Sequence, residues 1–526
     1  MQFLPVNLDA FLVELDDLDS AMALFRSLDA ARLPGVAELL PAARTVLVRL
    51  APGADRAVLI AAIAALDLTP HSDDTARLVE IPVQYAGPDL AEVAEILGIS
   101  PSEVIRRHAA AEYHVAFTGF APGFAYMTAP DAGLEVPRRP TPRTRIPAGA
   151  VGLAGPFSGV YPRESPGGWQ IIGVTPAIMF DPARTPAALL APGDRVRFRA
   201  IDSLPPAARP RPATATVTAA PTRPGLRLTS ARLPVLVQDM GRPGQAGIGV
   251  PVSGALDRGA LARANALLGN PATAPGLEIT LGGATFTAET AMVLALTGAP
   301  CGLTLTTAEG RVMTAPHDRA LHLRLGDMLE IAPPERGMRS YLAVAGRLDV
   351  TPTLGSAATD SLSGLGPAPL VPGDRLALAD RPTEPPRALP AAPPLPASGQ
   401  TVVLDVAMGP RTDMFTPGAV ALFAGQDWLV TPDSSRTGIR LSGAQALERA
   451  DTAELPSEGT LRGAIQVPAQ GQPVLFLSDH PVTGGYPVIA SVAPHHLDLA
   501  GQIPPGARIR FRPLAPFHRL NPEIAR

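Results

Sequence analysis

One pattern of turns and strands occurs twice in this 526-residue chain, and that repetition constrains the fold more than any other feature. In the first copy, Gly167-Gly168-Trp169 precedes Pro192-Gly193-Asp194 and the alternating segment Arg195–Phe198. In the second copy, Gly484-Gly485-Tyr486 precedes a Pro-Gly turn and the alternating segment Arg508–Phe511. Proline fixes φ and glycine accepts positive φ, so such turns reverse the chain. Alternating apolar residues indicate half-buried strands, and two similar β units are therefore predicted.

A third copy of the closing signal, Leu370–Leu376, indicates a further unit between the other two. The 61 prolines and 49 glycines are spread among apolar segments, which favours turn-dense β structure over disorder. Short strands with turns at close intervals are typical of barrels or sandwiches. We predict a mainly β protein with three barrel-like units, one in a first module and two in a second.

The first 75 residues differ and predict a small α/β N-terminal domain. Helical spacing runs over Ser20–Ala31 and over Asp55–Leu66, with Asp55 as the expected N-cap, and Thr45–Leu50 has a strand pattern. This order favours a split βαβ unit. The predicted division is a small domain at 1–75, a barrel at 76–202, a linker at 203–222, a barrel at 223–381, a Pro-rich linker at 382–398 and a barrel at 399–526.

Composition excludes several classes of function. The chain has no lysine, so it cannot supply a P-loop lysine, a Schiff-base lysine or the lysine that carries covalent biotin. A net charge of −4 gives no overall attraction to nucleic acid or an anionic membrane. Cys301 is the sole cysteine, and neither a secretory signal nor an apolar run long enough to span a bilayer is present. We expect a cytoplasmic protein without nucleic-acid or membrane partners.

Three segments have compositions suited to binding a small ligand. Aromatic residues and two glycines in Tyr113–Tyr126 favour a loop that cages a ligand, although a barrel corner with core aromatics fits equally well. Arginine forks in Pro137–Arg145 suit carboxylate or phosphate, although a solvated edge strand has the same pattern. The turn before Trp169 offers backbone N–H groups to an anion, or is a plain hairpin.

The histidines give no standard catalytic or metal-binding pattern. None of the nine lies in a His-x-x-x-His or Cys/His cluster, so no metal site is predicted. His495 and His496 are adjacent, and adjacent side chains usually point apart. His108 precedes the aromatic loop and is a candidate general base, although a core or surface histidine is the simpler interpretation.

Six motifs together carry a family resemblance. In the first half they are Gly119–Phe124, Pro137–Arg139 and Ser165–Trp169, and in the second half Gln238–Gly244, Ser435–Leu441 and Gly484–Tyr486. The first three resemble the B subunit of bacterial 5-oxoprolinase and the other three resemble its C subunit, and the resemblance covers nearly the whole chain. The same families are called allophanate hydrolase subunits 1 and 2, paired kinase inhibitors of sporulation control, and the carboxyltransferase part of urea carboxylase. The resemblance implies a fusion of both subunits, built from tandem cyclophilin-like barrels. Departures from the family pattern are Ala150, Gly346-Arg347, Gly366-Pro367 and Val482.

The resemblance implies ATP-dependent opening of 5-oxoproline to L-glutamate with a separate protein, the A subunit. ATP, with Mg²⁺, is expected to bind mainly together with that partner. The reaction needs an anion grip for the substrate carboxylate and activation of the lactam carbonyl, for which arginine forks and Gly-rich turns are suited. Candidate catalytic residues are His108, Asp239 and Asp479. Candidate substrate- and anion-binding residues are Phe120, Gly123, Arg138, Arg145, Gly167, Gly168, Trp169, Ser435, Arg436, Arg440, Gly484, Gly485 and Tyr486.

Two other functions stay open at this point. One is the carboxyltransferase component of a biotin-dependent urea carboxylase or allophanate system, with biotin on a partner. The other is a regulatory protein that inhibits a histidine kinase, which suits a fusion poorly because inhibitor and antagonist would always be tethered. Whether the chain forms a homo-oligomer and which half binds nucleotide are also open. A cleft between the modules is the expected place for a shared site.

Overall fold

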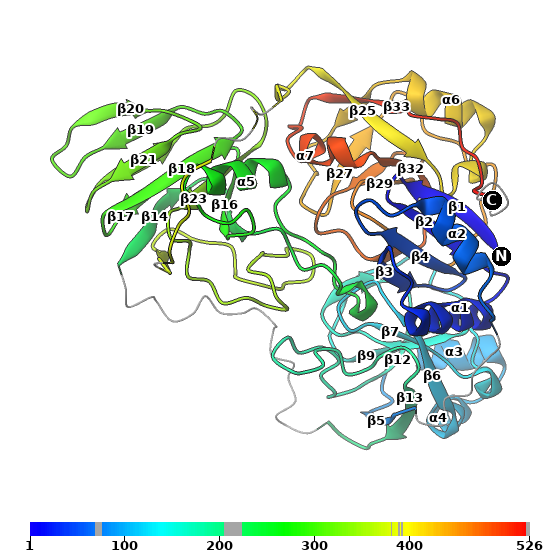
Figure 1. Ribbon diagram of the computed structural model, residues 1–526. Coiled ribbons are helices and arrows are strands. Elements are labelled where there is room, and N and C mark those ends of the chain that lie inside the picture. Colours follow the sequence, from blue (N-terminus) through cyan, green and yellow to red (C-terminus); the bar gives the residue numbers. More distant parts are fainter. Residues whose placement is uncertain (69–75, 205–223, 380, 388–389, 391–392, 522–526) are drawn as a thin grey trace.

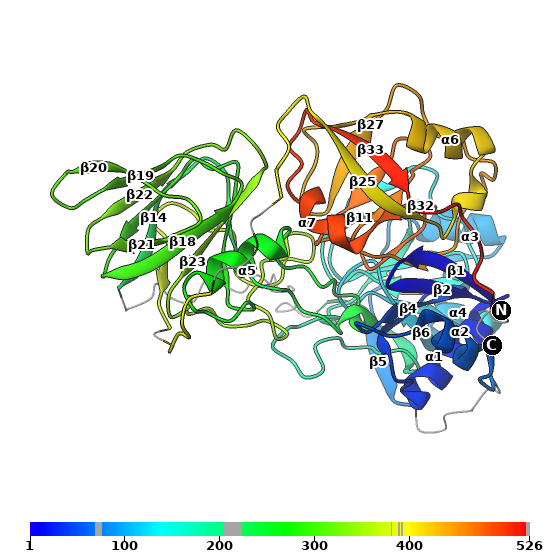
Figure 2. The same cartoon turned by 45° about the horizontal axis from the view of Figure 1, so that its top comes forward.

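A computed structural model describes residues 1–68, 76–204, 224–379, 381–387, 390 and 393–521. It contains a small α/β domain and three β units, so the predicted fold class is confirmed. The small domain lies between the first β unit and the C-terminal barrel, and the middle unit projects to one side (Figures 1 and 2). Most of the linker predicted at 203–222 lies outside the described residues.

The small domain has one antiparallel sheet with strand order β1-β2-β4-β3. The predicted split βαβ unit is confirmed, because α1 joins β2 to β3 and both strands pair antiparallel with β4 between them, so they run parallel to each other. The hairpin of β1 and β2 was not predicted. Four of the five residues of β2 are buried, so no alternation marked it as a strand. The predicted N-cap is confirmed, since the Asp55 carboxylate accepts from the N–H groups of Ala57 and Val58. The elements are β1 (Gln2–Asn7), β2 (Ala10–Glu14), α1 (Leu18–Ala31), β3 (Val36–Pro41), β4 (Thr45–Leu50) and α2 (Arg56–Ala64).

The first β unit is a seven-stranded sheet with strand order β12-β9-β10-β7-β6-β13-β5, and β8 pairs with β11 outside it. Helices α3 and α4 contact β12 and β13. The elements are β5 (Leu78–Val83), α3 (Leu90–Leu97), α4 (Pro101–Ala110), β6 (Glu112–Thr118), β7 (Ala125–Thr128), η1 (Pro130–Ala132), β8 (Arg143–Ile146), β9 (Ala150–Ala154), β10 (Phe157–Val160), β11 (Ser165–Gly167), β12 (Gln170–Val174) and β13 (Arg195–Ala200).

The C-terminal unit is a closed seven-stranded barrel, β25-β32-β29-β30-β27-β26-β33, and β28 pairs with β31 outside it. The elements are β25 (Thr401–Met408), η3 (Thr412–Met414), α6 (Pro417–Gly425), β26 (Trp428–Val430), β27 (Gly438–Ser442), β28 (Glu458–Gly459), β29 (Ala464–Gln466), β30 (Val474–Phe476), β31 (Thr483–Gly484), β32 (Val488–Val492), η4 (Pro494–His496), α7 (Leu497–Ala500) and β33 (Arg508–Pro513).

The sequence repeat corresponds to a shared topology in these two units. In each, the strand after the Pro-Gly turn pairs in parallel with the unit's first strand: β13 with β5, and β33 with β25. The turn glycines, Gly193 and Gly506, have φ values of 91° and 85°, which a side chain would disfavour. In each unit, the Gly-Gly-aromatic turn also follows a short strand of the separate two-stranded sheet.

The middle unit consists of a six-stranded and a five-stranded sheet that share one core. Its closing strand, β24, pairs antiparallel with β14, unlike the parallel closure of the other units. The described part of the Pro-rich segment 382–398 lies against this unit, where Glu384 N–H donates to the Gly269 carbonyl at 2.8 Å. The elements are β14 (Gly225–Ala231), β15 (Val235–Gln238), η2 (Ala246–Ile248), α5 (Arg258–Ala266), β16 (Gly276–Thr280), β17 (Ala284–Ala288), β18 (Met292–Gly298), β19 (Leu303–Thr306), β20 (Val312–Ala315), β21 (Ala320–Leu323), β22 (Met328–Ile331), β23 (Arg339–Val344) and β24 (Arg375–Ala377).

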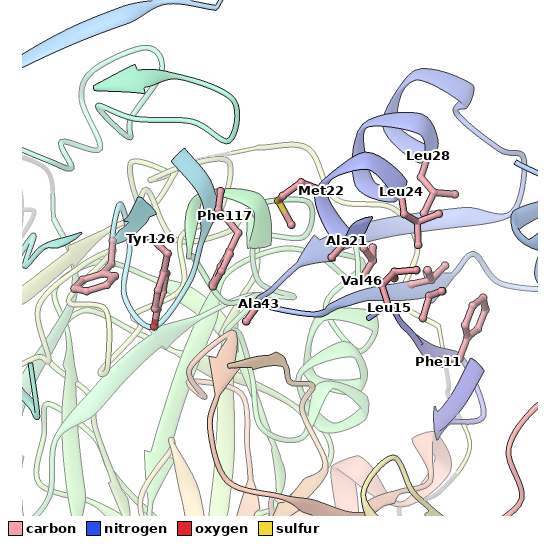
Figure 3. Close-up of a cluster of buried hydrophobic side chains, with 14 of the residues drawn as sticks. Phe11, Leu15, Ala21, Met22, Leu24, Leu28, Ala43, Val46, Phe117 and Tyr126 are labelled. Carbon is pink, nitrogen blue, oxygen red and sulfur yellow. The ribbon is translucent and has the colours of Figure 1, made fainter. Parts of the chain in front are cut away.

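The small domain contacts both modules through buried apolar side chains. On one side, Met22 of α1 belongs to a core cluster that also contains Phe117 and Tyr126 of the first β unit (Figure 3). On the other side, Leu47 of β4 shares a cluster with Val482 of the C-terminal barrel. Apolar burial is the main favourable term in association, so the small domain holds the two modules together. No helix in the described chain is both long and apolar enough to cross a bilayer.

Candidate functional site

A cavity of about 100 Å³ lies where the small domain meets the segment before α5 and the C-terminal barrel. A single water needs about 10–15 Å³ of such space, so the cavity admits several waters or one small solute. Its walls come from both modules: Asn7 Nδ2 donates to the carbonyl of Val492, 485 positions away, at 3.0 Å. The cavity therefore exists only when both modules are assembled.

Three arginines line the cavity, and two of them are paired. Arg49 on β4 lies 3.0 Å from Glu38 on β3, Nη1 to Oε2. Arg462, which precedes β29, donates from Nη2 to the carbonyl of Leu256 at 2.6 Å and lies 3.5 Å from Asp498. The Nε atom of Arg462 is buried and has no hydrogen-bond partner.

The third arginine, Arg258, forms no ion pair with any described residue. It begins α5, and its Nη2 donates to the carbonyl of Ser253 at 3.2 Å. Its Nε is buried without a hydrogen-bond partner. Burial, with repulsion from Arg462, lowers the pKa of the Arg258 guanidinium to about 10. A partly buried cation that has a buried, unpaired Nε and no ion-pair partner among the described residues suits an anion in the cavity.

His480 adds a proton acceptor to the same cavity. Its Nδ1 lies 2.9 Å from the carbonyl oxygen of Pro481, which can only accept, so Nδ1 carries the proton. Burial lowers the pKa of His480 to about 4, and the ring is therefore neutral at pH 7. Within the described residues no donor reaches Nε2. Phe476 stacks on the ring at 5.9 Å and fixes its plane. The result is an oriented imidazole with a free lone pair.

Hydroxyl groups complete the polar lining. The Oγ atom of Ser478 is buried without a hydrogen-bond partner. Ser253 differs, because its hydroxyl already donates to Asp479 at 2.7 Å. With Arg258 and His480, Ser478 gives a small ligand a cationic donor, a neutral acceptor and a hydroxyl.

The predicted residues Arg436 and Asp479 lie next to this cavity but face each other. Arg436 Nε is 2.9 Å from Asp479 Oδ2, and its Nη1 is 2.5 Å from Glu278 of the middle unit. Ser361 donates to Asp479 from both its N–H and its hydroxyl. Burial alone would raise the pKa of Asp479, but Arg436 outweighs it and holds that pKa below its usual value. Arg436 was predicted to bind an anion and Asp479 to be catalytic; in this structure their side chains join two units of the protein.

Asp239 and His108 are also engaged in structural contacts. The Asp239 carboxylate accepts from Gly241, Ser356 and Ala357 and organises two loops of the middle unit. Asp239 and His108 were predicted to be catalytic, and neither lines the cavity.

His108 is fully buried in the first β unit, with Nδ1 2.7 Å from Tyr85 Oη and Nε2 2.9 Å from Ser158 Oγ. It stacks on Phe198 at 4.3 Å. Burial lowers its pKa to about 3, so it is a neutral core histidine with both nitrogens occupied. The geometry favours the simpler interpretation of this histidine over the general-base hypothesis.

The predicted surface arginines do not converge on the cavity. Arg138 and Arg145 form exposed ion pairs with Glu454 and Glu164 at 3.1 and 2.7 Å. Arg440 on β27 is exposed, as is Ser435 in the preceding turn. Exposed pairs contribute little to binding or stability, and none of these residues lines the cavity.

The aromatic loop is part of an interface between modules. Phe120 N–H donates to Thr483 Oγ1 at 2.9 Å, and Gly123 N–H donates to the carbonyl of Ile248 at 2.9 Å. A Cβ at Gly119 would lie 2.3 Å from Thr483 Oγ1, so this position requires glycine for close approach. Phe120 and Gly123, which were predicted to bind a ligand, here take part in packing between the modules.

Neither Gly-Gly-aromatic turn lines the main cavity. Trp169 is buried against Phe124 at 5.2 Å, and Gly167 lies close to the Tyr161 hydroxyl, so this turn belongs to the first unit's core. Gly168 accepts a backbone hydrogen bond from Arg139. In the other copy, Tyr486 is 49% exposed. Gly484 and Tyr486 line a separate, smaller cavity next to the main one, and Gly485 follows in the same turn.

The sequence contained the three residues that we missed, but not as a recognisable set. Arg258 begins α5, Arg462 precedes β29, and His480 lies between the predicted residues Asp479 and Tyr486. They come from separate loops, so the only available signal was their proximity to Gly-rich turns. His495 and His496 were expected to diverge, yet both face Asp405, with ring centroids 4.4 Å apart. Together these three could hold a metal ion, but Arg512 donates to the same carboxylate at 2.6 Å, and its positive charge opposes a cation.

Comparisons with known proteins cover both modules. Residues 1–190 match the family described as carboxyltransferase domain, subdomain C and D, and residues 248–513 match subdomain A and B. The chain is 38% identical to the C subunit of 5-oxoprolinase from Escherichia coli K12 over 294 residues, 54% of this chain and 90% of that protein. It is 52% identical to the B subunit of 5-oxoprolinase from Escherichia coli O157:H7 over 125 residues, 23% of this chain and 57% of that protein.

Two further similarities bear on the whole chain and on the alternative function. The crystal structure of TTHA0988 has a TM-score of 0.81 and 35% identity, and the match covers 96% of this chain and 99% of that one. Urea amidolyase of Lachancea kluyveri is 33% identical over 305 residues, which are 53% of this chain but 16% of that protein. The first similarity spans both modules and the second spans half of the chain.

Proposed function

The chain belongs to the carboxyltransferase-domain family that includes the B and C subunits of 5-oxoprolinase, and we propose that it is the fused B and C component of an ATP-dependent 5-oxoprolinase. In this proposal it opens 5-oxoproline to L-glutamate together with a separate protein that is similar to the 5-oxoprolinase A subunit. The proposed class is an ATP-dependent amide hydrolase component.

The observation that carries the proposal is the cavity shared by both modules. Asn7 and Arg49 come from the B-like half, whereas Arg258, Arg462 and His480 come from the C-like half. Two merely tethered proteins would not share an interior site. A small cavity with cationic donors is what a carboxylate substrate such as 5-oxoproline requires.

The chemistry of lactam opening accounts for the charge of this cavity. A lactam carbonyl is unreactive towards water, and transfer of the ATP γ-phosphoryl group to its oxygen would make it electrophilic. A first water then adds to that carbon, and the ring C–N bond breaks as the nitrogen takes a proton, which gives an acyl phosphate. A second water hydrolyses this acyl phosphate to the glutamate carboxylate and inorganic phosphate. Negative charge grows on the carbonyl oxygen during these steps, and the arginines that line the cavity can stabilise such charge.

The cavity is too small to hold a whole ATP molecule together with the substrate. The volume of about 100 Å³ is well below the roughly 300–1,000 Å³ typical of sites for larger ligands. We therefore propose that only the reacting end of the nucleotide approaches the cavity. The open surface and the partner protein would supply the contacts to Mg²⁺ and to the rest of the nucleotide. The arginines of the cavity suit anions and disfavour a metal cation.

A second candidate is the carboxyltransferase component of a biotin-dependent urea system. The similarity to urea amidolyase favours it. This chain lacks lysine, so biotin would have to arrive on another protein. Urea is neutral, however, and would leave Arg258 without a counter-ion.

The test combines the purified chain with a protein similar to the A subunit, ATP and 5-oxoproline, and measures glutamate and ADP. The expected result is glutamate that depends on both proteins and on ATP. A parallel reaction supplies a biotin carboxylase, a biotinyl protein, bicarbonate and urea. Absence of glutamate, with urea-dependent ADP formation in the parallel reaction, would refute the proposal in favour of the alternative.

A further inference from the structure

We infer that the junction cavity binds a compact carboxylate that carries an N–H group on the adjacent carbon, with Arg258 on the carboxylate and His480 Nε2 accepting from the N–H. This inference rests on the proposed function for its probe, because 5-oxoproline has both groups. The two contacts give the ligand one orientation, and the need for a carboxylate distinguishes this site from one that binds neutral amides.

The carboxylate end is set by unpaired cationic donors. Arg258 has no carboxylate partner among the described residues, and its Nε and that of Arg462 are both buried without hydrogen bonds. Arginine forks bind carboxylates through two parallel hydrogen bonds. A ligand carboxylate here supplies the counter-ion and satisfies a buried donor in one step.

The N–H end is set by the tautomer of His480. Because Nδ1–H donates to Pro481, Nε2 presents a lone pair and binds a donor. A carboxylate at Nε2 would require the protonated ring, which burial opposes. The ligand is thereby oriented with its N–H towards His480 and its negative charge towards Arg258. The buried Ser478 hydroxyl remains available to a third polar atom, such as a lactam oxygen.

The test measures binding of 5-oxoproline to the purified full-length chain by isothermal titration calorimetry. Two analogues each lack one feature: 5-oxoprolinamide has no negative charge, and N-methyl-5-oxoproline has no N–H. Arg258→Gln should weaken 5-oxoproline binding at least about thirtyfold and abolish the preference over the amide. His480→Leu should abolish the preference over the N-methyl compound while keeping the preference for the charged ligand.

Two controls separate binding from folding. Arg311→Gln changes an exposed arginine of the middle unit and should leave every affinity unchanged. Arg258→Gln should keep or raise the melting temperature of the free protein, because burial disfavours the cation it removes. A purely structural Arg258 would instead lower it.

The inference is overturned if Arg258→Gln still prefers 5-oxoproline over its amide, or if the wild-type chain binds the N-methyl compound equally well. Its failure differs from failure of the proposed function. Glutamate formation with unaltered ligand preferences in the variants refutes the site alone. Selective binding without glutamate formation refutes the function alone.

Discussion

Replacing Arg436 by methionine should destabilise the junction of the middle unit and the C-terminal barrel by several kcal/mol. Methionine keeps much of the side-chain volume but removes the cation that lies 2.9 Å from Asp479 and 2.5 Å from Glu278. Both carboxylates are fully buried. Removing one partner of a buried ion pair costs about 3–5 kcal/mol, because the other charge is left uncompensated.

The loss of stability in Arg436→Met should depend on pH, and the two carboxylates determine the direction of that dependence. In the wild type, Arg436 outweighs burial and holds the pKa values of Asp479 and Glu278 below their usual values, so their contribution is present above pH 4 and is lost in stronger acid. Without Arg436, burial raises the pKa of Asp479 above that of the unfolded chain, whereas Glu278 keeps Arg339 at 3.6 Å. The charged form of Asp479 then destabilises the variant, and the difference from wild type should shrink as the pH falls from 7 to 5.

The assay is urea unfolding followed by the fluorescence of Trp428, which is fully buried in the C-terminal barrel. The only other tryptophan, Trp169, is replaced by phenylalanine in every protein so that the signal reports on one barrel. Arg440→Met, four residues further on and exposed, is the matched control and should change stability by less than about 0.5 kcal/mol. The reasoning fails if Arg436→Met matches the control at pH 7, or if its deficit grows on acidification.

Three other perturbations test the packing around the site. Gly119→Ala places a Cβ 2.3 Å from Thr483 Oγ1 and should lower both the stability of the protein and its affinity for 5-oxoproline. Adding Thr483→Ala removes the clash and should restore both. If calorimetry shows no rescue in the double variant, this steric explanation is wrong. His108→Leu should cost about 2 kcal/mol at pH 7 for two lost hydrogen bonds. Because burial lowers the pKa of His108, the wild type loses stability below pH 6.5, and the variant should lose less in urea titrations at pH 5. Fragments 1–204 and 224–526, co-expressed, should copurify through the small domain's contacts, and separate elution would contradict them.

Local sequence rules predicted the parts of the fold that depend on neighbouring residues. The Asp55 cap and the positive φ of Gly193 follow from residue chemistry within a few positions. The hairpin of β1 and β2 escaped because a strand buried on both faces shows no alternation. The antiparallel closure of β24 escaped because the same turn signal serves either pairing.

Residue type predicted what the site residues bind, but not which molecule supplies it. Arg436 was expected to grip an anion, and it does, but the anions are the protein's own Asp479 and Glu278. Arg258 has the same chemistry and stands in no recognisable motif, yet it is the arginine without an internal counter-ion among the described residues that line the cavity. Burial and pairing between distant parts of the chain separate these cases, and neither is visible in a local motif.

The two copies of the repeat converge on one loop of the middle unit, and this explains why their equivalent motifs differ in role. When Gly167 is aligned with Gly484, Arg163 corresponds to His480. Arg163 donates to the carbonyl of Leu362, and the residue next to His480, Asp479, accepts from Ser361. Both copies thus orient the same loop. The C-terminal copy is also covered by β3 and β4 of the small domain, and the cavity forms there. A symmetric repeat therefore yields an asymmetric site, because the chain contains a single small domain to enclose it.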